Sequence, residues 1–487
     1  MDLQRWARFS RFPAYNDPKI SEEGLVITHS RSLTSGKISS QLFALAFPLL
    51  LGNILQQLYN VAAAVIVGQY IGKEAFAAIG VAGTVMNLFI FVLVGGCTGV
   101  SIILASLFGS GEYHSLRKES FLAIVFGAGF TLVVSLISIV LLSPLLESIN
   151  TPAEIFAYTQ QYLLIILAGL PATFFYNLCA AALRAVGNTR YALFFLMIAV
   201  AVNVGLTFVL VVPLGRGITG AAWATVFSQG LSAVLCMAYI KKKLPFLVPT
   251  REDMRYDGAL LKKTIIFASL SAMHQSSLYI GKILVQGAVN LLGTASIAAF
   301  TATTRIEGLS LAFGESGTES ISVFVAQNTG AGNKKRALKG FGEGLFALVA
   351  LGVAATCILY LSAERSIALF IGTNQAAAIA EGVAYMRLVS FFYVLGYTGS
   401  AFVGFFRGSG RINIPFIGTT MHLSVRVVLS YMLAPAMGLK AVALATGVGW
   451  VSIVLFQVAL FSGIRRRERK LELPDITTQR GFAPKHN

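Results

Sequence analysis

Long apolar runs, separated by short polar or glycine-rich intervals, follow one another along almost the whole chain. Each run is long enough for a membrane-spanning helix, since about 20 residues cross the hydrocarbon core at about 1.5 Å per residue. The pattern predicts an all-α polytopic membrane protein. The predicted twelve transmembrane helices cover residues 41–68, 75–108, 119–143, 157–183, 190–212, 218–240, 264–291, 295–328, 340–361, 378–406, 412–434 and 439–463. A soluble fold would have to bury all of these runs in its cores, and only 12% of the residues are charged, against about 25% in soluble domains.

Two stretches of the chain repeat the same spacing of glycine, alanine and lysine residues. Residues 71–118 match residues 292–339, and both copies end on a lysine. Equivalent positions include Gly109 with Gly330, and Arg184 with Arg407. Six helices followed by six in the same order predict two lobes with a pseudo-twofold axis along the membrane normal, and such repeats often enclose a transport path.

The apolar runs divide the chain into five parts. We predict a cytoplasmic N-terminal tail at residues 1–40, an N-lobe at 41–240 with helices 1–6, a linker at 241–263, a C-lobe at 264–463 with helices 7–12, and a C-terminal tail at 464–487. The linker is the longest polar interval inside the chain and contains three consecutive lysines and two prolines. No cleavable signal peptide is expected, because the first apolar run follows 40 polar and basic residues.

The net charge of +17 comes from basic residues gathered on one side of the predicted membrane. All but eight of the 38 lysines and arginines fall in the tails and in the loops of that side. The exceptions are Lys73, Arg216, Arg365 and Lys440 on the other side, and Lys282, Arg305, Arg387 and Arg426 within helices. The positive-inside rule therefore predicts that both termini lie in the cytoplasm. We expect the protein in the plasma (inner) membrane. The basic surplus is expected to face lipid headgroups, so it indicates no nucleic-acid partner.

Motifs for catalysis or metal binding are missing from the sequence. There is no Gly-rich phosphate loop with Lys and Ser or Thr, and neither the five histidines nor the four cysteines show metal-ligand spacing. The cysteines lie singly in apolar runs and are expected to be reduced core residues. We therefore expect no enzyme and no cofactor.

Several short motifs resemble the bacterial multidrug and toxic compound extrusion (MATE) transporters. They are Leu58-Tyr59-Asn60 in helix 1, Arg305-Ile306-Glu307 in helix 8, Gln327-Asn328-Thr329-Gly330-Ala331-Gly332 at its end, and Arg184, Gly187 and Asn188 after helix 4. The resemblance covers about residues 42–464. It implies two six-helix lobes in a V around a central cavity. It also implies secondary active export of amphipathic organic compounds (drugs, toxins or metabolites) by exchange for H⁺ or Na⁺, through alternating access.

Three carboxylates lie well inside one predicted helix, helix 8. Glu307, Glu315 and Glu319 are spaced by eight and four residues, which places them roughly on one face. Glu315 lies about 20 Å from the cytoplasmic end of the helix, close to the centre of the bilayer. A desolvated carboxylate can hold a proton and release it when wetted, as a proton-coupled exporter requires.

Two cations are predicted at related depths, and their role has two interpretations. Arg426 in helix 11 is level with Glu315, and Lys282 in helix 7 lies nearer Glu307. The pairs either lock helices 7, 8 and 11 together or leave a carboxylate able to exchange protons. If Arg426 neutralises Glu315, then Glu319, which has no predicted partner, is the better coupling residue.

The N-lobe lacks a charge that the resemblance leads us to expect. The family carries an Asp shortly after the Leu-Tyr-Asn motif of helix 1, and this chain has Ala63 there. The family's helix 5 Asn does match, at Asn203, but Asn203 with Thr225 is a poor ligand set for Na⁺. We therefore favour H⁺ over Na⁺ as the coupling ion, with the helix 8 carboxylates as the coupling groups.

Polar residues on the first helix of each lobe are candidates for lining the substrate cavity. They are Gln56, Gln57, Tyr59 and Asn60 in the N-lobe, and His274, Gln275, Tyr279, Lys282 and Gln286 in the C-lobe. Alternatively, they form hydrogen bonds between helices. His274 either titrates during transport or is a packed, hydrogen-bonded core residue.

Two other functions are alternatives to export. A flippase of lipid-linked oligosaccharide from the same superfamily is expected to have a more cationic cavity and extra helices. A membrane-embedded enzyme or sensor requires clustered ligands or a soluble effector domain, which the sequence lacks. The expected partners are a small-molecule substrate and membrane lipids, with the protein a monomer.

Overall fold

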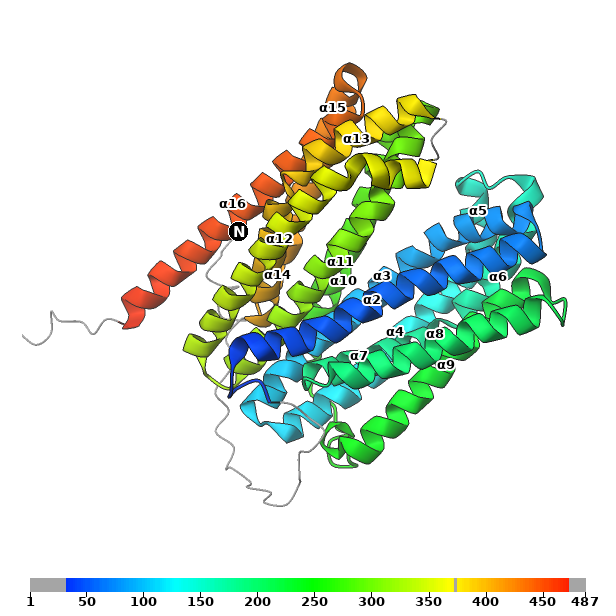
Figure 1. The fold of residues 1–487 in the computed structure, drawn as a ribbon. Coiled ribbons are helices and arrows are strands. Elements are labelled where there is room, and N and C mark those ends of the chain that lie inside the picture. Colours follow the sequence, from blue (N-terminus) through cyan, green and yellow to red (C-terminus); the bar gives the residue numbers. More distant parts are fainter. Residues whose placement is uncertain (1–31, 372–374, 473–487) are drawn as a thin grey trace, which may run out of the picture.

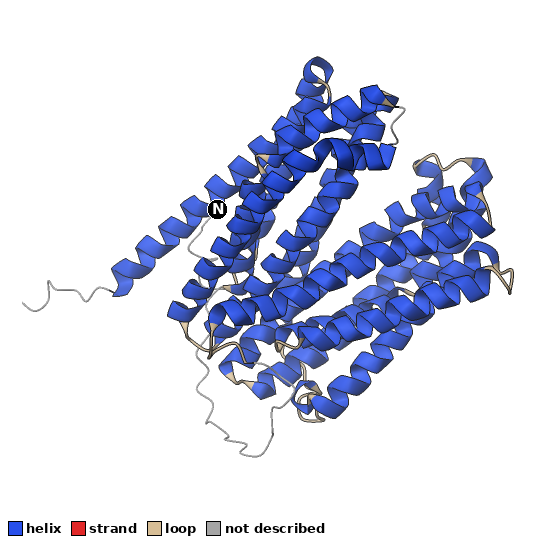
Figure 2. Cartoon of the chain, in the orientation of Figure 1, coloured by secondary structure: helices blue, strands red, loops and turns tan. Residues whose placement is uncertain are grey.

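In a computed structural model, residues 32–371 and 375–472 are described, and all regular structure in these ranges is helical (Figure 2). The N-terminal half contains α2 (Ile38–Tyr70), α3 (Lys73–Ser110), α4 (Tyr113–Val140), α5 (Leu142–Ser148), α6 (Ala153–Ala168), α7 (Leu170–Ala185), α8 (Thr189–Val211), α9 (Gly217–Lys243) and the 3-10 turn η1 (Pro245–Leu247). The C-terminal half contains α10 (Gly258–Asn290), α11 (Thr294–Gly330), α12 (Lys334–Ile371), α13 (Ala376–Ser390), α14 (Tyr393–Gly408), α15 (Asn413–Met437) and α16 (Leu439–Glu472). The prediction of an all-α protein is confirmed.

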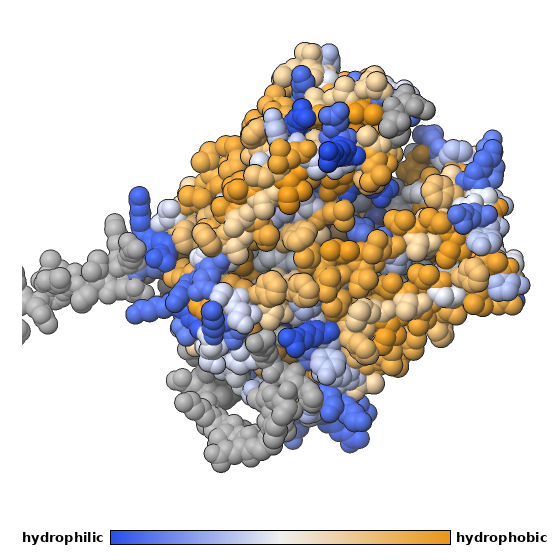
Figure 3. Space-filling view, viewed as in Figure 1, coloured by the Kyte–Doolittle hydropathy of each residue, from blue (hydrophilic) through white to orange (hydrophobic). Residues whose placement is uncertain are grey.

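The helices form two lobes, α2–α9 and α10–α16, that meet at one end and diverge toward the other (Figure 1). We call the end at which they meet the linker end, because the segment between α9 and α10 lies there. On the face that Figure 3 shows, apolar side chains cover most of both lobes, while hydrophilic ones gather toward the two ends. This distribution is that of a protein whose helices are surrounded by lipid.

Two predicted helices are in fact bent pairs. The α6–α7 pair bends by 49° and the α13–α14 pair by 51°, at the same place in the two repeats. At the first break Pro171 follows Gly169 and supplies no backbone N–H for the helical ladder. In addition, α16 continues to Glu472, past the predicted end at residue 463. The predicted tails otherwise fall largely outside the described residues.

Eight helices are individually long and apolar enough to span a membrane, and the two bent pairs bring the number to ten within the described residues. The helices α10 and α11 complete the twelve that the sequence predicts but fall short in apolar content. The reason lies in their position, since both pack against α3 and α11 also packs against α2. Facing the other lobe rather than lipid, they can carry the charged and polar residues of the central region.

The linker end is closed by close backbone approach and by hydrogen bonds between the lobes. The Gln327 side chain of α11 donates to the Ala185 carbonyl at 2.7 Å and accepts from the Leu33 amide at 3.0 Å. On another face, the buried Glu119 of α4 accepts a 2.7 Å hydrogen bond from Thr264 of α10. Separation of the lobes at this end has to break each of these contacts.

Candidate coupling site between the lobes

An ion pair joins the two lobes at the level of Glu319. Arg184, in the last turn of α7, places its Nε atom 3.4 Å from Oε1 of Glu319 on α11. The two side chains are only 16% and 17% exposed, so water screens the attraction weakly. The sequence predicted no partner for Glu319, and that prediction is wrong because the partner comes from the other lobe.

The repeat-equivalent arginine, Arg407 of α14, lies near the same carboxylate. Arg407 interacts electrostatically with Glu319 and with Glu315. Arg407 is buried, and its Nη2 atom lies 2.9 Å from Nδ1 of His274 on α10. Of the two arginines that the duplication makes equivalent, Arg184 pairs with Glu319 across the lobe boundary, and Arg407 bonds His274 within the C-lobe.

His274 is held from both sides within the C-lobe. An arginine can only donate, so Nδ1 of His274 accepts from Arg407, and Nε2 carries the hydrogen that is donated to Thr419 Oγ1 at 3.0 Å. A second proton on the ring would have to displace the Arg407 bond and place two cations together. The packed, hydrogen-bonded interpretation of His274 is the one that the geometry supports.

The two ion pairs proposed from helix depth do not form. Within the described residues, neither Glu315 with Arg426 nor Glu307 with Lys282 lies within ion-pair distance. Beyond ion-pair distance, Arg426 and Lys282 both act electrostatically on Glu307, and Lys282 and Arg407 both act on Glu315. Depth along a helix gave the level of each charge but not the direction in which it faces.

Glu307 belongs to a tyrosine cluster in the half of the C-lobe away from the linker end. Its carboxylate is buried and accepts a 3.3 Å hydrogen bond from the Tyr385 hydroxyl. Glu315, by contrast, is exposed and has no ion pair among the described residues. Of the three α11 carboxylates, only Glu319 forms an ion pair between the lobes.

The N-lobe polar site contains the residues that the sequence named, with one addition. The Asn203 Nδ2 atom donates to Thr225 at 3.1 Å and to Ser228 at 3.3 Å, while its Oδ1 atom is buried without a partner. No carboxylate completes this set, since Ala63 stands at the family's Asp position. Across the described residues, no group of three or more His, Cys, Asp or Glu could hold a metal ion.

The candidate cavity residues differ in their surroundings. Tyr279 reaches across the lobe boundary, where its hydroxyl donates to the Thr84 carbonyl of α3 at 2.9 Å. Gln286 bonds Asn290 of its own helix at 2.9 Å. Gln56, Gln57 and Lys282 are exposed, Tyr59 and Gln275 are half-buried, and the Asn60 side chain lies outside the described residues. Only Tyr279 among them is shown to contact the other lobe.

Sequence reasoning missed the two arginines of the site. Arg184 and Arg407 were counted with the basic residues of the cytoplasmic side, because each lies at the end of an apolar run. Both are in fact the last-turn cations of α7 and α14, turned inward. Their equivalence in the duplication was the available signal, since a charge repeated at a helix end inside an apolar protein is a functional candidate.

The same duplication appears in the comparison with known proteins. The family model MatE matches residues 48–209 and matches again at residues 271–432. The chain belongs to the MatE family. It is therefore a polytopic membrane transporter and not an enzyme, and the family resemblance read from the sequence is confirmed.

Curated MatE relatives carry names of multidrug resistance proteins. The chain is 25% identical over 423 residues to the "Probable multidrug resistance protein YpnP" of Bacillus subtilis, covering 86% of this chain and 93% of that protein. It is also 25% identical over 441 residues to the "Probable multidrug resistance protein NorM" of Thermotoga maritima, covering 87% and 91%.

Solved transporter structures share the fold. A multidrug resistance transporter of the family in an outward-facing conformation superposes with a TM-score of 0.83, at 20% identity, covering 89% of this chain and 98% of that one. A MOP superfamily transporter from Pyrococcus furiosus gives a TM-score of 0.82 over 91% of this chain and 98% of that one, also at 20% identity. At this identity the likeness establishes the two-lobed fold alone.

Proposed function

We propose that this MatE transporter exports amphipathic organic cations in exchange for protons, and that Glu319 is the proton-coupling carboxylate. The observation that carries the proposal is the ion pair between Arg184 of the N-lobe and Glu319 of the C-lobe. The two lobes must separate at this ion pair during transport. The charge of Glu319 therefore affects which arrangement of the lobes is favoured.

Protonation of Glu319 removes half of this ion pair. In the arrangement described here, the ionised pair helps to hold the linker end closed. A proton that arrives from the open end neutralises the carboxylate, weakens the closure and favours opening at the linker end. With the linker end on the cytoplasmic side, as the basic residues predict, the protonated form is the one that turns inward.

The return step uses the same residues. Once the linker end is open, Arg184 has moved away with its lobe, while Arg407 stays in the same lobe as Glu319 and still interacts with it electrostatically. A cationic substrate that binds near Glu319 disfavours the proton there by charge repulsion, and the proton leaves to the cytoplasm. The ionised carboxylate then re-forms the pair with Arg184 as the lobes close, and the substrate faces outward.

The test is transport of the cationic dye ethidium in proteoliposomes under an imposed pH gradient or an imposed Na⁺ gradient. We expect the wild type to respond to the pH gradient, and Glu319→Gln to lose that response. Glu315→Gln, which removes a charge of the same helix without an ion pair, is the matched control and should retain most of it. Undiminished pH-driven transport by Glu319→Gln would contradict the assignment of Glu319 as the coupling residue. Transport driven by Na⁺ alone would contradict the proposal that H⁺ is the coupling ion.

A further inference from the structure

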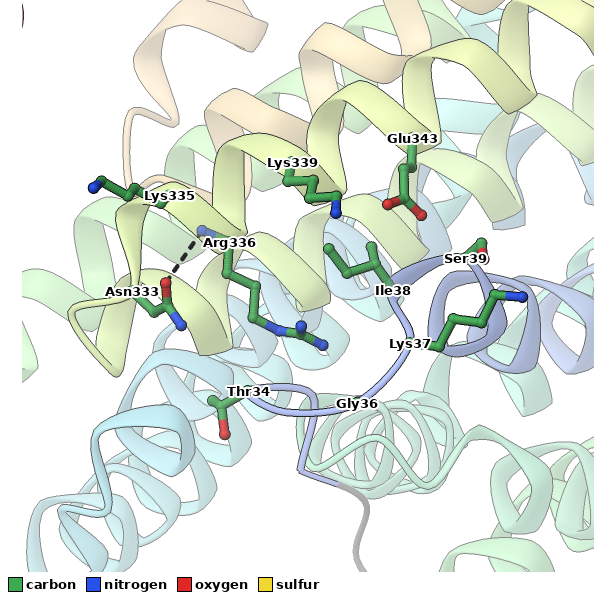
Figure 4. Close-up of a pocket in the computed structure, with 10 residues that line it drawn as sticks. All are labelled: Thr34, Gly36, Lys37, Ile38, Ser39, Asn333, Lys335, Arg336, Lys339 and Glu343. Atoms are coloured by element: carbon green, nitrogen blue, oxygen red, sulfur yellow. Dashed lines mark hydrogen bonds between the residues drawn. The ribbon is translucent and has the colours of Figure 1, made fainter.

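A polar pocket lies at the linker end, between the start of α2 in the N-lobe and the start of α12 in the C-lobe (Figure 4). Its volume is about 600 Å³. It is lined by Thr34, Gly36, Lys37, Ile38, Ser39, Asn333, Lys335, Arg336, Lys339 and Glu343. The pocket thus spans the lobe boundary and has no part in the Glu319 site.

The lining of this pocket is strongly basic, with four cations against one carboxylate. Figure 4 shows the Arg336 and Lys339 side chains directed into the pocket, while Lys37 and Lys335 lie at its rim and point outward. Within the described residues, none of the four forms an ion pair with a carboxylate. Cations that lie close together without carboxylate partners repel one another, and a bound anion relieves this repulsion.

Arg336 is held in place by contacts with the segment before α2. Its Nε atom donates to the Leu33 carbonyl at 3.1 Å, and its Nη2 atom donates to Gln41 Oε1 at 2.8 Å. The guanidinium also lies 5.4 Å from the ring centre of Phe324. The guanidinium is therefore held in a fixed position, and its remaining N–H donors are available to a ligand.

Two helix N-termini face the same pocket. Both α2 and α12 begin here, and neither has an acidic residue in its first turn. The N-terminus of α2 has no side-chain cap, whereas the Arg336 amide at the start of α12 donates to Asn333 Oδ1 at 3.1 Å. The positive dipole ends of both helices add to the field of the lysines. Ser39, in the first turn of α2, offers a hydroxyl on the same side (Figure 4).

We propose that this pocket binds a phosphate group and that the bound phosphate joins the two lobes at the linker end. Phosphate matches the lining, because it accepts hydrogen bonds from guanidinium, ammonium, hydroxyl and helix N–H donors together. The phosphate is supplied either by the headgroup of an anionic phospholipid of the adjoining leaflet or by a soluble phosphate. Because its ligands come from α2 and α12, binding favours the closed arrangement of the linker end.

Native mass spectrometry of the purified full-length protein tests the proposal. The wild type is titrated with phosphatidylglycerol and with phosphatidylcholine, and the first bound lipid is quantified. The double variant Lys335→Gln/Lys339→Gln removes two pocket cations, and Lys242→Gln/Lys243→Gln is the matched control, since it removes two exposed cations of the same end outside the pocket. A second arm measures the melting temperature of each protein with and without inorganic phosphate.

We expect the pocket variant to bind the first phosphatidylglycerol about tenfold more weakly than the wild type and the control. Phosphatidylcholine, which carries no net charge, should show no such difference. If inorganic phosphate stabilises the wild type and the control but not the pocket variant, with no preference for phosphatidylglycerol, the site is a soluble-phosphate site. Equal phosphatidylglycerol binding by both variants, with equal phosphate stabilisation, would overturn the proposal.

Discussion

Gly109 of α3 and Gly330 of α11 occupy the same position in the two repeats, and each presses against the backbone of the other's helix. A Cβ atom on Gly109 would overlap the Gln327 carbonyl oxygen, and one on Gly330 would overlap the Ser106 carbonyl oxygen. Hydrogen is the only substituent that fits at either point. The pseudo-twofold relation between the copies therefore becomes a physical contact across the lobe boundary.

From this contact we expect Gly330→Ala to destabilise the closed linker end. The obstacle is backbone rather than a flexible side chain, so the helices must move apart, at a cost of about 1–3 kcal/mol. A lower melting temperature of the purified protein and faster labelling of cysteines introduced at the linker end would show this. Gly96→Ala, in α3 with open space around it, is the control, and equal effects of the two substitutions would contradict the prediction.

The ion pair between Arg184 and Glu319 should be visible as an energetic coupling. We expect Arg184→Met and Glu319→Gln each to lower stability by about 1–3 kcal/mol, because each leaves a partly buried charge without its partner. The double variant should lose clearly less stability than the sum of the two single losses, since both charges of the Arg184–Glu319 pair are then removed together. A double-mutant cycle on melting temperatures measures this, and strict additivity would show that the 3.4 Å pair carries no energy.

The linker between the lobes is fixed to α4 through Asp253. This buried carboxylate lies 2.7 Å from both His114 Nδ1 and Arg117 Nε, and it accepts bonds from the amide and the hydroxyl of Thr250. We expect Asp253→Asn to loosen the linker, so that trypsin cleaves after Arg251 and Arg255 several-fold faster at neutral pH. The neighbouring exposed Glu252 supplies the control, and Glu252→Gln should be cut at the wild-type rate.

The same carboxylate predicts a pH dependence outside the membrane. Burial by itself would raise the pKa of Asp253, but the hydrogen bonds from Thr250 and Arg117 outweigh it and hold the pKa below its usual value. A carboxylate whose pKa is lowered in the folded state stabilises the folded protein at neutral pH. This stabilisation is lost as the pH falls from the usual pKa through the lowered one. The difference in melting temperature between wild type and Asp253→Asn should therefore be full at pH 7 and shrink below about pH 4. A difference that stays constant down to pH 3 would contradict this.

His274 is expected to matter for stability and not for proton coupling. Both ring nitrogens are engaged, with Arg407 and Thr419. Replacement by Gln should lower stability by about 1–3 kcal/mol through a buried donor or acceptor left unpaired. The pH profile of ethidium transport should keep its wild-type shape, whereas Glu319→Gln should change it. A pH profile altered by His274→Gln would restore the titrating interpretation of this residue.

The order of the long apolar helices could be predicted because it depends on local chain properties, whereas the short α5 (Leu142–Ser148) was not predicted. An apolar run of sufficient length has one low-energy form in lipid, the helix, and the predicted runs correspond to the observed helices. The break between α6 and α7 was missed although Pro171 marks it, because the apolar run continues through the proline. The break between α13 and α14, at Phe391 and Phe392, carries no proline and no comparable signal.

The charged groups show where such prediction ends. The sequence determined the duplication, the three carboxylates of one helix and the depth of each, because all of these follow from spacing along the chain. Only the tertiary structure decided their partners: Arg184 for Glu319, Tyr385 for Glu307, and Arg407 for His274. Pairing depends on which faces of two helices, far apart in sequence, face each other. Close contacts such as that of Gly109 with α11 fix these faces. The spacing of residues within one helix does not encode such contacts.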